Sequence, residues 1–373
     1  MGDEEKLRKE LDRKHGILRL RPNLVPQAYP GLNRIGVRNS RPGKLGYASE
    51  RWIACCVGRL RRLRSEPKAP KAGLSVVDLE TTHHNILLAD AFDLLPSRML
   101  GDSFAKANQN TLGFMLGILD VGYPIFSHIH PQRDESYYFL QHPEASGSLP
   151  YSHLGLHPDT TSSEVLDCLK RWKDDKALDL SPAYRLTTGE GFYTRAGVPH
   201  APGTAITLEL GEASDDYHIL QADYMGKLFS KRDFLLKELS SEEDVIGLIN
   251  FEASTDPSYY HKYHLLPEPV TGQLEEGYTE RWIYSPRTTG KYSGKELIVK
   301  PGARITCHED AAHPLLIWQG RGVVEQTPVR ARSGEDEVLV TKETAEVGYT
   351  VKNTGSSWLI AYKAFGPNVY SQT

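Results

Sequence analysis

The most informative part of this 373-residue sequence is Gly122-Tyr-Pro-Ile-Phe-Ser-His128-Ile-His130-Pro-Gln-Arg-Asp-Glu135, which reads G-x5-H-x-H-x4-E. Residues two apart on a β-strand face the same side, so the imidazoles of His128 and His130 point in the same direction. Glu135 can return toward them from the following turn. We therefore expect three metal ligands to converge at this stretch.

A second motif further along the chain supplies a fourth ligand. It reads Gly189-x5-Arg195-x-Gly197-x2-His200, and it places His200 at the end of a strand and turn. Neutral imidazoles with one carboxylate suit a borderline divalent ion, so zinc is our first choice, with iron, manganese or nickel as alternatives. The other interpretation is a half-exposed strand that carries stray histidines. The full spacing and the second motif favour one bound metal ion per chain.

Together the two motifs resemble the cupin signature, although Arg195 stands where proline is common. The resemblance implies a mainly β fold, the double-stranded β-helix. Short β-rich runs separated by turn residues fill 111–222 and again 278–373, and one helix with a capping box, Thr161 and Glu164, interrupts the first series. We predict a bicupin with a helical insertion, divided into an N-terminal wrap with strands that complete the first barrel (1–110), a metal-binding barrel (111–224), a helical segment and linker (225–265) and a degenerate second barrel (266–373).

The order of segments resembles type I phosphomannose isomerase across nearly the whole chain. This resemblance implies a metal-dependent aldose–ketose isomerase that acts on a sugar or sugar phosphate through an enediol. It puts Glu135 on the family's metal-ligand glutamate and His128 on its metal-ligand glutamine. The segments that carry the resemblance are Ser49–Ile53, Leu116–Asp120, Phe126–Pro131, Asp134–Leu140 and, best of all, Gly155–Asp216.

Two further departures from that family remove positive charge. Gly117 stands where the family's strand carries lysine, and His218 stands where it carries an arginine. A phosphate dianion normally needs such charge-assisted donors, so we expect an unphosphorylated sugar as substrate. The residues that could restore an anion site are Arg185, Arg195 and the run Arg59–Arg64, for which a solvated loop is the plainer interpretation.

Three residues are candidates for catalysis. Glu209 and His218 lie on strands that follow the metal motif, and either is placed to shuttle a proton or to orient a ligand histidine. Arg195 is placed to contact a substrate oxygen or to lie at the rim.

The second barrel repeats the metal motif in a degenerate form. His308 is kept, but Asp310 occupies the place of the second histidine and His313 that of the glutamate, while Tyr349 falls where the closing histidine would stand. We expect a structural barrel that supports the first.

Two other function classes remain open at this stage. The same ligand set serves iron-dependent cupin dioxygenases, and the missing cations are compatible with a non-catalytic sugar-binding cupin. The net charge argues against nucleic acid or an anionic membrane as a partner. The chain has 48 acidic and 44 basic residues, so their charges nearly cancel and provide no electrostatic attraction to either. Four cysteines without CxxC spacing favour a reducing compartment. We expect a cytoplasmic protein whose partner is a small sugar, and we allow for a homodimer.

Overall fold

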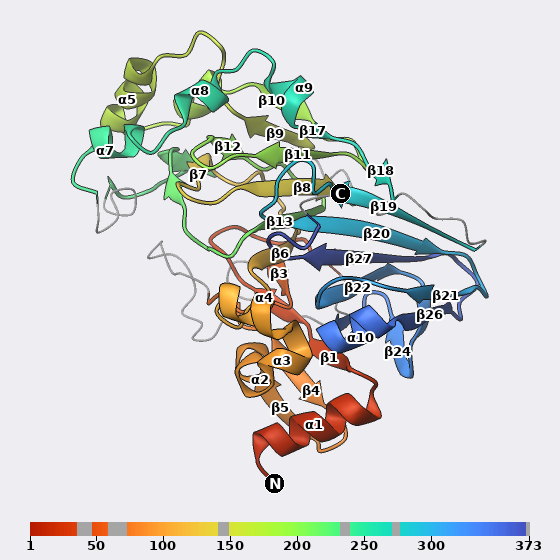
Figure 1. Cartoon of the computed structure of the whole chain (residues 1–373). Coiled ribbons are helices and arrows are strands. Elements are labelled where there is room, and N and C mark those ends of the chain that lie inside the picture. The colour runs from red at the N-terminus through yellow and green to blue at the C-terminus, as the bar shows by residue number, and fades with distance from the viewer. Residues whose placement is uncertain (36–46, 59–72, 141–148, 232–238, 271–276, 371–373) are drawn as a thin grey trace.

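The structure, a computed structural model, describes residues 1–35, 47–58, 73–140, 149–231, 239–270 and 277–370. It is mainly β, and every strand pairing in these ranges is antiparallel. Two barrels lie side by side, with short helices against their outer faces (Figure 1). The predicted bicupin is therefore confirmed. The basic run Arg59–Arg64 and residues 232–238 of the expected helical segment and linker (225–265) lie outside the described residues.

The first barrel consists of two facing sheets. The larger has seven strands in the order β17 (His264–Leu265), β11 (Gly191–Thr194), β8 (Glu135–Phe139), β13 (Thr207–Glu212), β6 (Phe114–Leu119), β3 (Glu50–Ile53) and β2 (Asn23–Val25). The smaller has five strands in the order β10 (Ala183–Arg185), β9 (Tyr151–Leu154), β12 (His200–Ala201), β7 (His128–Ile129) and β14 (His218–Ile219). A short hairpin of β15 (Asp223–Tyr224) and β16 (Lys227–Leu228) follows.

The second barrel has the same plan with a longer sheet. Nine strands follow the order β18 (Glu268–Pro269), β19 (Tyr278–Tyr284), β20 (Ser293–Val299), β27 (Leu359–Phe365), β22 (His313–Gln319), β25 (Glu337–Val340), β1 (Ile17–Arg21), β4 (Val76–Leu79) and β5 (His84–Leu87). Four more form the facing sheet, in the order β21 (Arg304–Cys307), β26 (Tyr349–Asn353), β23 (Arg321–Val324) and β24 (Thr327–Arg330).

The N-terminal strands are shared between the barrels, which differs from our expectation for residues 1–110. Strands β2 and β3 do join the first barrel, but β1, β4 and β5 extend the large sheet of the second. The physical reason is burial. Ile17 on β1 packs in the interior of the second barrel, whereas Leu18 and Leu20 face the core between the barrels.

Helices cover the two ends of the molecule. Next to the N-terminal strands lie α1 (Asp3–Arg13), α2 (Leu88–Leu94), α3 (Pro96–Leu100), α4 (Asp102–Ala107) and α10 (Lys342–Val347), and the first barrel carries α5 (Ser162–Arg171), the 3₁₀ helix η1 (Lys176–Leu180), α7 (Glu242–Ile246), α8 (Phe251–Ser254) and α9 (Tyr259–Tyr263) (Figure 1). The predicted capping box of α5 is confirmed, because Thr161 and Glu164 satisfy each other's backbone N–H groups. None of the described helices is long and apolar enough to cross a lipid bilayer.

A continuous core joins the two barrels and fixes which side chains of β13 face the first barrel's interior. Leu208 and Leu210 pack in this core together with Tyr284 and Tyr362 of the second barrel. Since side chains alternate along a strand, Glu209 between the two leucines points into the first barrel. Across the same interface Arg51 of β3 reaches the second barrel's β25 region, where its guanidinium binds a buried pair of carboxylates, Asp336 at 2.7 and 2.8 Å and Glu337 at 2.8 Å.

Candidate metal centre

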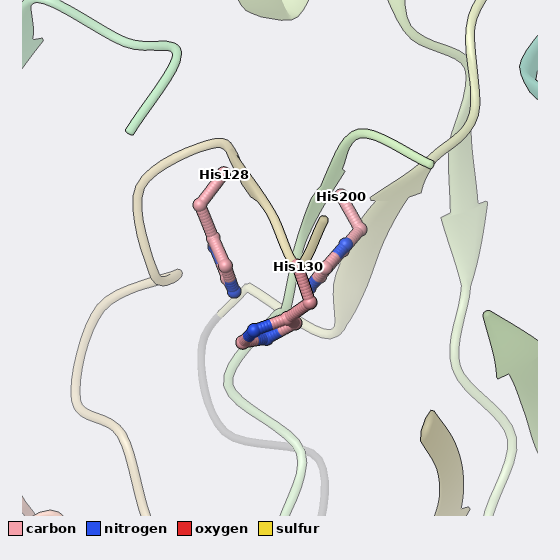
Figure 2. Close-up of side chains that lie close together, drawn as sticks. All are labelled: His128, His130 and His200. Carbon is pink, nitrogen blue, oxygen red and sulfur yellow. The ribbon is translucent and has the colours of Figure 1, made fainter. Parts of the chain in front are cut away.

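Three histidines converge inside the first barrel (Figure 2). His128 and His130 come from β7 and the residue after it, and His200 pairs directly with His128 across β12. One ring nitrogen from each of the three lies within 4.8 Å of the others. The interpretation of the H-x-H segment as a strand with stray histidines is therefore wrong, because all three imidazoles are buried and share one focus.

Backbone carbonyl groups fix the orientation of each imidazole. The Nδ1 atom of His128 lies 2.9 Å from the Phe126 carbonyl oxygen, that of His200 lies 2.9 Å from the Val198 oxygen, and that of His130 lies 2.5 Å from the Asp216 oxygen. A carbonyl can only accept, so each Nδ1 carries the proton. Each Nε2 then presents its lone pair to the common centre, which is how proteins orient metal-binding histidines.

Glu135, at the start of β8, lies beside the three histidines. Its carboxylate lies 2.9 Å from Nε2 of His200 and 3.3 Å from Nε2 of His130. The Oε2 atom of Glu135 and the Nε2 atom of His200 are both buried and make no hydrogen bond, although Oε2 has an ion-pair contact with Arg133 at 3.2 Å. Buried polar atoms are rarely left in this state unless something else satisfies them. A borderline divalent ion fits these two atoms and the donor set, three imidazoles and one carboxylate.

The protonation states of the ligands suit a cation. Burial lowers the pKa of His128 well below its usual value, and the neighbouring His200 and His130 lower it further. Burial has the same effect on the pKa of His130. Burial alone would raise the pKa of Glu135, but His130, His200 and Arg133 outweigh it and hold that pKa well below its usual value. His128 and His130 are therefore neutral and Glu135 is ionised at neutral pH.

The turn before His200 depends on a glycine. Gly197 has a φ of +76°, a left-handed conformation that other residues adopt with strain, and a Cβ atom there would lie 2.7 Å from the Leu248 carbonyl oxygen. Its N–H group donates to the carbonyl oxygen of His130 at 2.8 Å. The glycine of the second motif thus connects the two ligand segments.

A pocket opens next to the histidines and contains a carboxylate that the metal set does not use. Glu209 lines this pocket together with His128 and His130. Burial raises the pKa of Glu209 to about 8, and the negative charges of Glu135 and Glu50 add to the effect, while Arg133 opposes it. A carboxylic acid that titrates near neutral pH is suited to accept and return a proton.

Arg133 holds the two functional carboxylates together. Its side chain is 3% exposed, and its guanidinium binds Glu209, the carbonyl oxygen of Ser214 at 3.0 Å and Glu135 at 3.2 Å. The sequence motif contains Arg133 between His130 and Glu135, but our sequence analysis assigned it no role. The position of a positively charged residue between two predicted metal ligands was the sequence feature that could have indicated this role.

A third carboxylate faces the same pocket from β3. Glu50 is 6% exposed and accepts hydrogen bonds from the indole N–H of Trp52 at 2.6 Å, the amide of Gln27 at 3.0 Å and the Tyr29 hydroxyl. The remaining lining residues are Met115, Leu119, Ile125, Phe126, Tyr137, Pro202, Asp215 and Tyr217. The sequence analysis missed Glu50 and Asp215, since nothing local in the chain indicates that they approach the metal motif.

The other two catalytic candidates lie elsewhere. His218 is buried on β14 directly opposite Ile129, so the strand register turns it away from the side of β7 that presents the ligand histidines. Arg195 is exposed and hydrogen-bonds Tyr263. Neither residue lines the pocket. Of the three catalytic candidates, all of which the structure describes, Glu209 alone lines the pocket beside His128 and His130.

The interior of the second barrel holds a salt-bridge network at the corresponding place. Lys295 and Lys363 each lie two residues from a side chain that packs in the barrel interior, Leu297 and Ala361 respectively, so both lysines also point inward. Both ammonium groups bind Glu309, at 2.6 and 2.7 Å. Glu280 binds Lys363 at 2.6 Å. The Nε2 atom of His313 hydrogen-bonds the hydroxyl of Tyr349 at 2.8 Å. Buried lysines thus provide the positive charge in this barrel.

Comparison with known proteins supports the fold. No protein-family model matches this chain, and no curated protein matches it. Solved structures do match: a mutant of phosphomannose isomerase from Salmonella typhimurium (TM-score 0.66, 11% identity, 94% of this chain and 100% of the other) and the zinc-bound form of mannose 6-phosphate isomerase (TM-score 0.62, 11% identity, 94% and 100%). A proposed mannosephosphate isomerase from Archaeoglobus fulgidus has a TM-score of 0.61 at 15% identity and covers 94% and 97%.

The chain has the bicupin fold. Its fold is that of the phosphomannose isomerases, as the order of sequence segments predicted. Identities of 11–15% establish a shared fold and leave the reaction to be argued from the site.

Proposed function

We propose that this protein is a metal-dependent aldose–ketose isomerase whose single metal ion is held by His128, His130, Glu135 and His200. The observation that supports the proposal most strongly is the position of Glu209. A proton-accepting carboxylate lines the same pocket as His128 and His130, and its pKa is raised to about 8. An isomerase needs both elements, because a proton must leave the carbon next to a polarised carbonyl and return to its neighbour.

The metal, for which we propose zinc, would supply Lewis-acid polarisation of the substrate's adjacent oxygens when bound. The chain's own residues do the rest of the work. Glu209 takes the proton from one carbon of the open-chain sugar and delivers it to the next, while the hydroxyl proton of one adjacent substrate oxygen passes to the other, so that the sugar passes through an enediol. Arg133 fixes the Glu209 carboxylate by hydrogen bonding and keeps its position constant as it gains and loses the proton.

Tyr137 supports the ligand side of the centre. Its hydroxyl donates to Glu135, and burial together with the charge of Glu135 raises the pKa of Tyr137 well above its usual value, so the phenol stays protonated. The apolar walls of Leu119, Ile125 and Phe126 reduce access of water to the pocket. This shields a reactive intermediate from side reactions.

Proton exchange with deuterated water tests the proposal. The zinc-loaded protein is incubated in D₂O with a panel of free and phosphorylated aldoses and ketoses, and deuterium at C1 and C2 is followed by NMR together with the interconversion of isomers. We expect exchange with at least one sugar, its loss on chelation and its recovery on adding metal back. Glu209→Gln should abolish exchange but keep the metal. Oxygen consumption during turnover, or saturable sugar binding without exchange in the metal-loaded protein, would overturn the proposal.

A further inference from the structure

The pocket beside the metal ligands is rich in carboxylates. Glu50, Glu209 and Asp215 line it, and among the described lining residues Arg133 is the one side chain with a permanent positive charge. That guanidinium is already bound to Glu209 and Glu135. Burial keeps Glu209 largely protonated at neutral pH, so a divalent ion and the guanidinium would be balanced by Glu135, Glu50 and Asp215. The described lining therefore leaves no positive charge over for an anionic substrate, and Glu50 and Asp215 would repel one.

Glu50 is held as a fixed acceptor in this pocket. Donors from Gln27, Tyr29 and Trp52 bind its carboxylate from the protein side. Burial raises the pKa of Tyr29, and the negative charge of Glu50 raises it further, so the Tyr29 hydroxyl stays a donor. A carboxylate has about four acceptor positions, so lone pairs remain for groups in the pocket. The groups that such acceptors bind best are hydroxyl donors.

These features discriminate between classes of sugar. The hydroxyl groups of a polyhydroxy chain can donate to the carboxylates, whereas a phosphate or carboxylate group on the substrate offers only acceptors and a repelling charge. A buried pocket screens that repulsion less than bulk water does.

We propose that the substrate of this site is an uncharged sugar, and that Glu50 binds its hydroxyl groups and selects against phosphorylated analogues. This inference rests on the proposed isomerase function, because it assigns the ligand of the same pocket. It makes Glu50 a specificity-determining residue.

The register of β6 shows where the pocket has room for a further side chain. Gly117 lies opposite Glu209 across the β6–β13 ladder, on the same face of the sheet. A Cβ atom at Gly117 would have Trp52 Cδ1 at 3.5 Å and the Arg51 carbonyl oxygen at 3.7 Å, which is ordinary contact. Gly117→Lys would therefore add a positive charge to this acidic pocket without backbone strain.

Calorimetry with linear polyols tests the inference without turnover. Mannitol and mannitol 1-phosphate resemble open-chain sugars but have no carbonyl group to isomerise, and each is titrated into the zinc-loaded full-length chain. We expect mannitol to bind at least tenfold more tightly than its phosphate ester in 50 mM NaCl, and the ratio to narrow as salt is raised. Equal or tighter binding of the phosphate ester, or no binding of either polyol, would overturn the inference.

Variants identify the residues responsible. Glu50→Gln should reduce the discrimination to less than threefold, and Asp215→Asn serves as a second carboxylate variant if Glu50→Gln disturbs the fold. Gly117→Lys should favour the phosphate ester. Glu252→Gln, which removes an exposed carboxylate outside the pocket, should leave the ratio unchanged. If the ratio of mannitol to mannitol 1-phosphate affinity is unchanged in both Glu50→Gln and Asp215→Asn, these carboxylates do not select against the phosphate ester.

The two proposals fail separately. Preference for the phosphate ester together with isomerisation of sugar phosphates overturns the substrate class and leaves the isomerase intact. Selective binding of the uncharged polyol without exchange on any sugar overturns the isomerase and leaves the selectivity of the pocket intact.

Discussion

The raised pKa of Glu209 predicts that the unfolding free energy depends on pH. Its side chain is 14% exposed, and its pKa is about 8 in the folded protein against 4.5 in the unfolded chain. The folded state therefore binds this proton more tightly, so stability must fall as pH rises from 4.5 through 8. Each pKa unit corresponds to about 1.4 kcal/mol, so the span from pH 5 to pH 8 corresponds to about 4 kcal/mol. Glu209→Gln resembles the protonated form at every pH and should lack this loss.

The assay is urea denaturation of the chelator-treated protein at pH 5, 6, 7 and 8. Only the difference in unfolding free energy between wild type and Glu209→Gln is interpreted, because the other titrating groups cancel in that difference. We expect Glu209→Gln to gain about 4 kcal/mol relative to wild type between pH 5 and pH 8, and the exposed control Glu252→Gln to gain nothing. A gain below about 1 kcal/mol would show that Glu209 is ionised in the metal-free pocket and would refute the reasoning. The same variant should lose roughly 10²–10⁴ in kcat if Glu209 moves the proton.

Three further predictions concern other buried groups. Arg51→Ala leaves two buried carboxylates of the barrel interface unpaired and should lower the unfolding free energy by about 3–5 kcal/mol in urea denaturation. A loss of less than about 0.5 kcal/mol would show that this ion pair does not stabilise the interface. Tyr137→Phe removes the donor to Glu135 and should weaken zinc affinity about 10–100-fold in competition with a chelator, and an unchanged affinity would exclude that contact from metal binding. Burial lowers the pKa of His313 to about 4, so protonation favours the unfolded chain and the unfolding free energy should fall by about 3 kcal/mol as pH drops from 6.5 to 4. His313→Gln should lack this loss. An equal loss in the variant would contradict the assignment of the effect to His313.

The convergence of the three histidines could be predicted because its information is local. Strand alternation places His128 and His130 on one face, and the second motif carries its own turn glycine, so the spacing alone predicts the convergence that the structure shows. The capping box of α5 is equally local, and its predicted reciprocal hydrogen bonds are present.

What the sequence did not reveal depends on long-range pairing. Glu50 reaches the pocket because β3 pairs with β6, and two of its donors, Gln27 and Tyr29, lie on the segment that follows β2. Arg133 looks like part of a turn until the register of β8 and β13 brings Glu209 beside it. Strands β1, β4 and β5 extend the second barrel although they precede the first in sequence, because their apolar faces fit its sheet and the core between the barrels. Arg195 was favoured by its place in a motif, but its position after β11 leaves it exposed.

The metal content of matched variants is the measurement that bears most directly on the proposed centre. Wild type, His200→Ala and His308→Ala are stripped with chelator, reconstituted with zinc, desalted and measured by elemental analysis. His308→Ala is the control, since it removes the histidine kept in the second barrel's degenerate motif, where buried lysines neutralise Glu309. We predict about one zinc per chain in wild type and His308→Ala, and less than about a tenth of that in His200→Ala. Two zinc ions per chain in wild type, or full zinc content in His200→Ala, would contradict a single centre built from His128, His130, Glu135 and His200.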